Sequence, residues 1–118
     1  MRIKISPLDR LFSQYVRLRA GRICERCGQT KTLQCCHFYG RRKRTVRWFE
    51  DNCCALCFSC HRYFDEHPLE FTEWFKKRLG EERFQLLTIQ ANMVGVPIDI
   101  EAITLYIKEK IKEVNNGS

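Results

Sequence analysis

The chain has 118 residues, a net charge of +7 and eight cysteines. This length suits one domain, or one small domain with a helical extension, whose limited core a metal could reinforce. No apolar run is long enough for a signal peptide or a membrane span, so we expect a cytoplasmic protein without a membrane partner. In a reducing compartment, cysteines favour metal ligands and small buried side chains over disulfides.

The positive charge is concentrated in the N-terminal half. The net charge is +5 over residues 1–23, +3 over residues 24–67 and −1 over residues 68–118. Because Lys and Arg release counterions when they neutralise phosphates, a polyanion such as DNA is the natural partner. A solvated basic surface that keeps the protein soluble is the alternative.

The spacing of apolar and turn residues predicts several elements in chain order. A helix is predicted from Pro7 to Gly21, and the segment TLQCCHFY (residues 32–39) is typical of a strand. Val46 to Phe49 can form a second short strand, with a turn at residues 50–52. Further helices are predicted over residues 58–67, 68–79, 81–94 and 100–114, the last capped by Asp99.

These elements predict a small α+β fold in which a ββα core is framed by an N-terminal helix and C-terminal helices. We expect the N-terminal helix in residues 1–21, the core in residues 22–67, the helical extension in residues 68–114 and a disordered tail in residues 115–118. The last helix carries one apolar stripe, which either packs on the core or forms the interface of a homodimer. The stripe consists of Ile100, Ile103, Ile107, Ile111 and Val114.

Two identical Cys-x-x-Cys pairs, Cys24 with Cys27 and Cys57 with Cys60, predict a structural zinc site. Each pair can place two thiolates on one side of a tight turn, and four thiolates complete a tetrahedral shell with no open position for water. Two independent redox-active or buried pairs are the alternative. The remaining cysteines are expected to be buried as small hydrophobic side chains. They are Cys35, Cys36, Cys53 and Cys54.

Residues capable of chemistry lie between and just after the two pairs. His37 precedes the expected turn, Asn52 follows it, and His61 comes directly after Cys60. Asp65 lies four residues after His61, so on a helix the two side chains could share a catalytic ion. A zinc that joins the start of the hairpin to the start of the helix would make His37 and His61 face each other.

The pattern C-x-x-C, H, N, C-x-x-C-H resembles the HNH nucleases of the His-Me finger (ββα-metal) superfamily. Within that superfamily the stretch from Cys35 to Asn52, the following Cys-x-x-Cys and the helical tail are most similar to phage recombination nucleases of the NinG/Rap type. The resemblance implies a zinc-stapled ββα-metal core and a metal-dependent endonuclease that hydrolyses DNA phosphodiester bonds. It also implies a phage or prophage origin in a bacterial host and a role in recombination.

The resemblance also implies roles for particular residues. His37 would be the general base that takes a proton from the attacking water, and Asn52 would orient the His37 ring. His61 would bind the catalytic Mg²⁺ or Mn²⁺, with Asp65 as a further ligand. Many HNH enzymes carry Asp or His where this chain has Cys36, a soft thiol poorly matched to Mg²⁺. Three outcomes are open. Asp65 replaces the missing ligand, which we favour; a thiophilic ion is preferred over Mg²⁺; or catalysis is impaired.

A basic loop follows the expected general base, and its charges would hold the phosphates of double-stranded or branched DNA. Its cationic residues are Arg41, Arg42, Lys43, Arg44 and Arg47. The alternative function is a non-catalytic zinc DNA-binding module with a degenerate HNH site, and a protein–protein zinc adaptor is a third candidate. Cutting a four-way junction symmetrically needs two active sites, so a homodimer would favour a junction-resolving enzyme.

Overall fold

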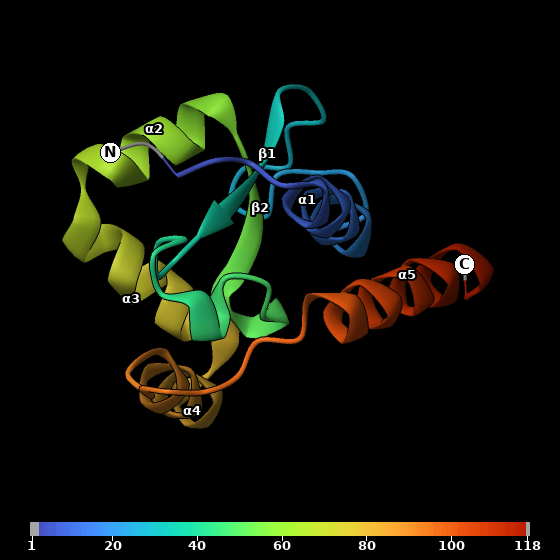
Figure 1. Ribbon diagram of the computed structural model, residues 1–118. Helices are drawn as coiled ribbons and strands as arrows, with labels where there is room; N and C mark the ends of the chain where they lie inside the picture. Colours follow the sequence, from blue (N-terminus) through green and yellow to red (C-terminus); the bar gives the residue numbers. More distant parts are fainter. Residues whose placement is uncertain (1–2, 118) are drawn as a thin grey trace.

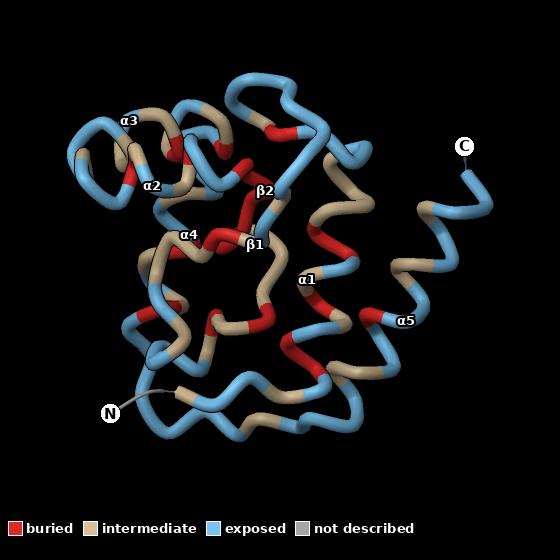
Figure 2. The backbone as a smooth tube through the Cα atoms, turned by 90° about the horizontal axis from the view of Figure 1, so that it is seen from above, coloured by how far each residue is buried: buried red, intermediate tan, exposed pale blue. Residues whose placement is uncertain are grey.

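A two-stranded antiparallel hairpin lies between two groups of helices in the computed structural model, which describes residues 3–117 (Figure 1). Its strands are β1 (Leu33–His37) and β2 (Cys53–Cys57). On one side α1 (Pro7–Arg19) and α5 (Ile100–Asn116) lie side by side (Figures 1 and 2). On the other side lie α2 (Phe58–Glu66), α3 (Pro68–Leu79) and α4 (Glu81–Ala91). The small α+β fold framed by helices is therefore confirmed.

The hairpin is covered on both faces, which explains why all five residues of β2 are buried. His37 pairs with Cys53 and Cys36 pairs with Cys54 in the register of the two strands. Since successive side chains on a strand alternate between faces, one cysteine of each adjacent pair points to each side. Cys35, Cys53 and Ala55 join the core beneath α1, whereas Cys36, Cys54 and Leu56 join the core beneath α2 and α3.

The second strand was wrongly predicted at Val46 to Phe49. That segment instead contains the short 3₁₀ helix η1 (Arg44–Val46), and the predicted turn is a second 3₁₀ helix, η2 (Glu50–Asn52). The true strand, CCALC, is covered on both faces and therefore lacks the alternation of polar and apolar residues that marks a half-exposed strand. Strand β1 also ends earlier than predicted, because the Phe38 N–H donates to the Asn52 carbonyl and closes the loop.

The apolar stripe of the last helix packs within the chain. Ile107 is fully buried in the core beside α1, and the other stripe residues except Ile100 pack against that core. The helix continues through Asn116, so residues 115 and 116 are helical and not disordered; Ser118 lies outside the described residues. Because α1 covers the stripe, the stripe is not an argument for a homodimer, which stays a prediction. No helix in residues 3–117 is long and apolar enough to cross a membrane.

Asp9 joins the N-terminal helix to the loop before β2. It forms a capping box with Ser6 at the start of α1. Its carboxylate also accepts hydrogen bonds from Arg47 at 3.0 and 2.6 Å and from the Trp48 indole at 3.0 Å. Burial alone would raise the pKa of Asp9, but the hydrogen bonds from Arg47 and Ser6 bring that pKa down to about 2.

We expect Asp9→Ala to lower the free energy of unfolding by roughly 3–5 kcal/mol, because it leaves the Arg47 guanidinium, only 11 % exposed, without its counter-charge. Urea unfolding at pH 7 measures this loss, with the exposed Glu101→Ala as a control that should change little. The Asp9 contribution is present above the usual pKa of 3.8 and is lost as the pH falls towards 2. A loss below about 1 kcal/mol at pH 7 would contradict this role.

Candidate metal centre and active site

The four cysteines of the two Cys-x-x-Cys pairs come together between the loop after α1 and the junction of β2 with α2. The sulfur atoms of Cys24, Cys27, Cys57 and Cys60 all lie within 4.8 Å of one another. The Cys27 and Cys57 sulfurs are 3.7 Å apart. A zinc tetrahedron with Zn–S bonds of ~2.3 Å has sulfur–sulfur edges of ~3.8 Å, so the cluster has the dimensions of a structural zinc site.

The surroundings of this cluster suit bound thiolates. Burial opposes ionisation of Cys24, but hydrogen bonds from the backbone N–H groups of Cys57, Cys27 and Arg26 bring the pKa of Cys24 down to about 7. Burial and the neighbouring thiols raise the pKa of Cys60 to about 12, although Arg26 donates to its sulfur at 3.5 Å. Since a coordinating ion deprotonates its thiols, the cluster is compatible with zinc.

The four other cysteines form two cross-strand pairs, one on each face of the hairpin. Cys36 pairs with Cys54 near α2, and Cys53 lies beside Cys35 near α1. Each thiol pair also has a histidine next to it: His61 contacts Cys36, and His37 lies with Cys35 and Cys53. Burial of these cysteines is confirmed, except that Cys35 is partly exposed.

His37 lies at the end of β1 and faces α1, where its ring is 6.3 Å from the Phe12 ring between centroids. Its Nε2 is 2.9 Å from the Arg47 carbonyl. Since a carbonyl only accepts, Nε2 carries the proton and Nδ1 carries the lone pair of the neutral ring. Burial lowers the pKa of His37, and the positive charges of Arg41 and Arg47 lower it further. The hydrogen bond to the Arg47 carbonyl and the negative charge of Asp9 act in the opposite direction. His37 is therefore held neutral with a fixed tautomer.

Asn52 is fully buried and fastens the loop between the strands. Its side-chain oxygen accepts from the Tyr39 N–H at 2.9 Å, and its amide donates to the carbonyls of Tyr39 and Val46 at 2.9 and 3.0 Å. Asn52 thus holds the loop that positions His37. It does not orient the His37 ring directly, because the Arg47 carbonyl does so.

His61 and Asp65 lie on α2, on the face of the hairpin opposite His37. His61 Nε2 is 3.9 Å from the Asp65 carboxylate, and Nδ1 is 2.7 Å from the side-chain oxygen of Gln34. The hydrogen bond with Cys36 raises the pKa of His61, and the pKa of Cys36 falls to about 6 through its bonds with Cys54 and His61. His37 and His61 therefore do not face each other, because adjacent strand residues point to opposite sides.

The basic loop divides into exposed charges and one internal anchor. Arg42, Lys43 and Arg44 are exposed, and Arg41 is partly exposed. The Arg41 Nε is buried and makes no hydrogen bond within the described chain. The positive charge of Arg41 lowers the pKa of His37. Arg47 is the internal anchor, because its guanidinium binds Asp9.

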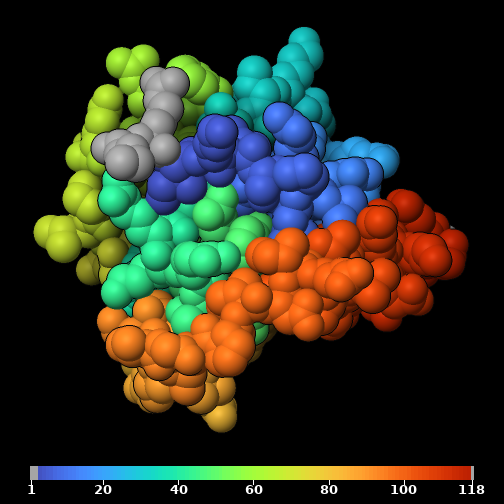
Figure 3. Space-filling view, in the orientation of Figure 1, coloured from blue at the N-terminus to red at the C-terminus, as the bar shows by residue number. Residues whose placement is uncertain are grey.

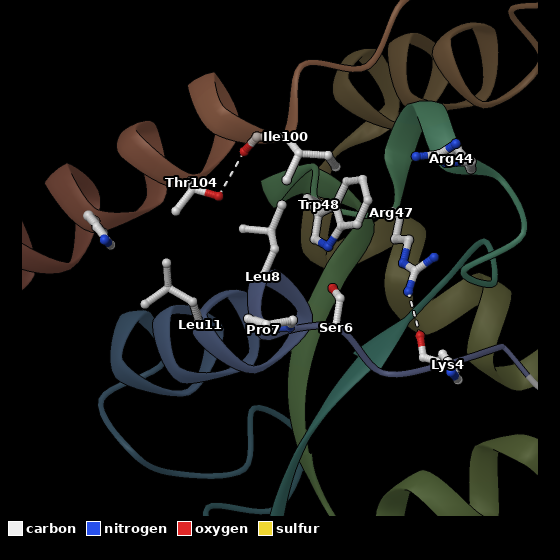
Figure 4. A pocket seen from close by; sticks show the side chains of 11 residues that line it. Lys4, Ser6, Pro7, Leu8, Leu11, Arg44, Arg47, Trp48, Ile100 and Thr104 are labelled. Carbon is white, nitrogen blue, oxygen red and sulfur yellow. Dashed lines mark hydrogen bonds between the residues drawn. The ribbon is translucent and has the colours of Figure 1, made fainter.

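A pocket of about 590 Å³ lies beside this loop, between the start of α1 and the start of α5 (Figure 4). Leu8, Trp48 and Ile100 form its apolar part, and Lys4, Arg44 and Lys108 are among its cations. None of its lining residues is acidic. Figure 3 shows the N-terminal segment, the loop and the start of α5 on one face of the molecule. Arg47 also lines this pocket, so the pocket adjoins the residue whose carbonyl orients His37.

Two contributors to the site were not predicted from the sequence. Asp9 holds the loop through Arg47, and Gln34 binds the His61 ring. The hydrogen bond of Asp9 within the capping box was a detectable local signal, since Ser6 and Asp9 have the spacing of that motif. The contact of Gln34 depends on how α2 packs over β1, which sequence spacing alone does not give.

Comparison with models of known protein families gives a match over nearly the whole chain. The family described as Bacteriophage Lambda NinG protein matches residues 3–117. None of the curated proteins and none of the solved structures matches the chain. The match spans nearly the whole chain, including the four-cysteine cluster, both strands and all five helices of the described range. The chain belongs to the bacteriophage lambda NinG family.

Proposed function

We propose that this NinG-family chain is a metal-dependent HNH endonuclease that hydrolyses DNA phosphodiester bonds in phage recombination. The observation that carries the proposal is His37, a neutral imidazole with its Nε2 proton fixed on the Arg47 carbonyl. A ring in this state offers its Nδ1 lone pair to a proton at neutral pH. It lies at the end of a strand in a ββα core, which matches the arrangement that the HNH resemblance implies.

In the proposed reaction, His37 Nδ1 takes a proton from a water molecule as its oxygen attacks phosphorus. The positive charge of Arg41, which also lowers the pKa of His37, would stabilise the phosphate as it gains negative charge during the attack. The bond from phosphorus to the 3′ oxygen then breaks. The resemblance assigns His61 and Asp65 to a divalent ion that would supply Lewis-acid stabilisation of that leaving oxygen, and for this the phosphate would have to reach the face of the hairpin opposite His37, where both residues lie.

Cys36 influences which ion would suit the site at His61 and Asp65. Its thiol contacts His61, and its lowered pKa favours the thiolate at neutral pH. A thiolate and an imidazole suit Mn²⁺ or Zn²⁺ better than Mg²⁺. We therefore propose Mn²⁺ as the more effective activating ion, with Asp65 as the oxygen ligand.

The substrate class that we propose is branched or otherwise partly unpaired duplex DNA. Exposed Arg42, Lys43 and Arg44 would bind phosphates on either side of the cut. The neighbouring pocket, apolar inside and lined by cations, has the character needed to hold an unpaired nucleotide with its phosphate at the rim. If two copies associate, each would supply one active site to a four-way junction.

A specific observation favours the second candidate, a zinc DNA-binding module without catalysis. His61 and Asp65 lie on the opposite face of the hairpin from His37, and the His61 ring is already bonded to Gln34 and Cys36. The test is incubation of supercoiled plasmid, linear duplex and a four-way junction with the protein and Mg²⁺ or Mn²⁺. Ion-dependent nicking supports the nuclease. Binding without cleavage under either ion supports the module.

The pH dependence of cleavage follows from the environment of His37. The base must be neutral, and its pKa in the folded protein lies below the usual 6.5. We expect the acidic limb of the single-turnover rate to have its midpoint below pH 6.5, so cleavage persists in mildly acidic buffer. Rates measured from about pH 5 to pH 8 test this, and a midpoint above the usual value would exclude His37 as the base that titrates.

A further inference from the structure

A second group of metal-binding residues lies on the face of the hairpin that α1 covers. Cys35 and His37 are two residues apart on β1, and Cys53 is directly opposite His37 on β2. The two sulfur atoms and a ring nitrogen of His37 all lie within 4.8 Å of one another. The four-cysteine cluster cannot share these ligands, because Cys53 and Cys57 are four residues apart, or roughly 13 Å along a strand.

The donor set has a definite chemical preference. Two thiols and one imidazole suit Zn²⁺ and Co²⁺, and they are poor ligands for Mg²⁺. Three protein ligands leave a fourth position open to water. The Nε2–H of His37 donates to the Arg47 carbonyl, which is the kind of contact that orients a metal-bound histidine through its other nitrogen.

The opposite face of the hairpin provides an internal comparison. It also carries a cross-strand cysteine pair, Cys36 with Cys54, and a histidine, His61. Within the described part of the chain, however, these three do not bring all their ligand atoms as close together as the group on the α1 face does. The difference singles out the group that contains His37.

We propose that Cys35, His37 and Cys53 form a second zinc site, separate from the four-cysteine cluster. An ion bound there takes the Nδ1 lone pair of His37, the same lone pair that the proposed reaction uses as its base. Zinc at this site therefore inhibits cleavage. The inhibition rests on the proposed function, whereas the binding of the ion does not.

Zinc content at equilibrium tests the site without reference to activity. The full chain is dialysed against buffers of fixed free Zn²⁺, and bound zinc is measured by elemental analysis. We expect about two ions per chain for the unmodified protein and about one for Cys53→Ala. Cys54→Ala is the matched control, since both side chains are fully buried on β2 but face opposite sides, and it should keep about two.

A second variant guards against misfolding of Cys53→Ala. Cys35 is only partly buried, so Cys35→Ser is a milder change that should also reduce the content to about one ion. Co²⁺ added to protein that holds one zinc ion per chain should give a sulfur-to-metal absorption band that Cys35→Ser loses and Cys54→Ala keeps. The proposal is overturned if the unmodified chain binds one ion at every free zinc concentration, or if Cys54→Ala loses the second ion.

Measurements of DNA cleavage distinguish the second zinc site from the proposed nuclease activity. Zinc in excess of the structural ion should slow cleavage at least about tenfold in the unmodified protein and leave Cys35→Ser unaffected. If the chain binds the second ion but never cleaves DNA, the second zinc site is supported and the proposed nuclease activity is contradicted. If the chain cleaves DNA but binds only one ion, the nuclease activity is supported and the second zinc site is contradicted.

Discussion

We expect removal of zinc from the four-cysteine cluster to unfold the core of this protein. Cys57→Ser, or extraction of the ion with a strong chelator, should abolish cooperative thermal unfolding and much of the helical circular dichroism. Binding of zinc to four thiolates contributes roughly 10–16 kcal/mol in small zinc domains, which is as large as the whole stability of a typical domain. The effect should therefore exceed that of any single substitution in the apolar core.

The position of Cys57 explains why loss of the zinc ion would unfold several elements together. Its sulfur belongs to the cluster and also accepts from the Cys60 N–H at 3.5 Å, at the start of α2. The same residue ends β2, so one ion joins the strand, the helix and the loop that carries Cys24. Cys54→Ala, a buried cysteine outside the cluster, is the control and should unfold cooperatively. An unchanged melting temperature after complete zinc removal would contradict a structural role for the ion.

Replacing His37 should remove cleavage while leaving the fold intact. We expect His37→Gln to slow single-turnover cleavage by roughly 10²–10⁴-fold, the usual contribution of a general base. Glutamine can still donate its amide to the Arg47 carbonyl, so the loop should keep its position. DNA binding should change little, because the exposed cations of the basic loop remain.

The control for this prediction is another histidine. His67 stacks on the Tyr63 ring at 4.0 Å between centroids, away from the strands, so His67→Gln should cleave at the unmodified rate. Zinc content and circular dichroism are measured on the same preparations. Equal cleavage by His37→Gln and the unmodified protein would assign the base to another group.

Local spacing was sufficient to predict the parts of the site that depend on short segments. Each Cys-x-x-Cys places its own two sulfurs, so the four-cysteine cluster followed from two repeats of one motif. The i and i+4 spacing of His61 and Asp65 also brought these residues together on α2, although only to 3.9 Å. The helices were recognisable because capping residues such as Ser6 and Asp99 act within a few residues.

Features that depend on strand register could not be predicted from the sequence. The four cysteines outside the two Cys-x-x-Cys pairs were expected only to be buried, because sequence spacing does not reveal which residues lie opposite each other across a hairpin. Register pairs Cys36 with Cys54 and places His37 opposite Cys53. Placing β2 at Val46 to Phe49 hid this register, and with it the division of the two histidines between faces.

Long-range contacts limited the prediction of the basic loop. Its charges suggested five phosphate contacts, yet Arg47 is held by Asp9 from the first helix. A carboxylate 38 residues away in the sequence thereby turns one cation into an anchor for the loop and for His37. The same contact explains how α1, outside the ββα core, supports the candidate site.

The most direct test is cleavage of a labelled four-way junction with Mn²⁺ by protein that holds one zinc ion per chain, run beside His37→Gln. We expect strand cleavage by the unmodified protein and a loss of roughly 10²–10⁴-fold in the variant, each with only the four-cysteine cluster occupied by zinc. Tight junction binding with no cleavage by either protein, under Mn²⁺ or Mg²⁺, would contradict the account and leave a zinc-stapled DNA-binding module.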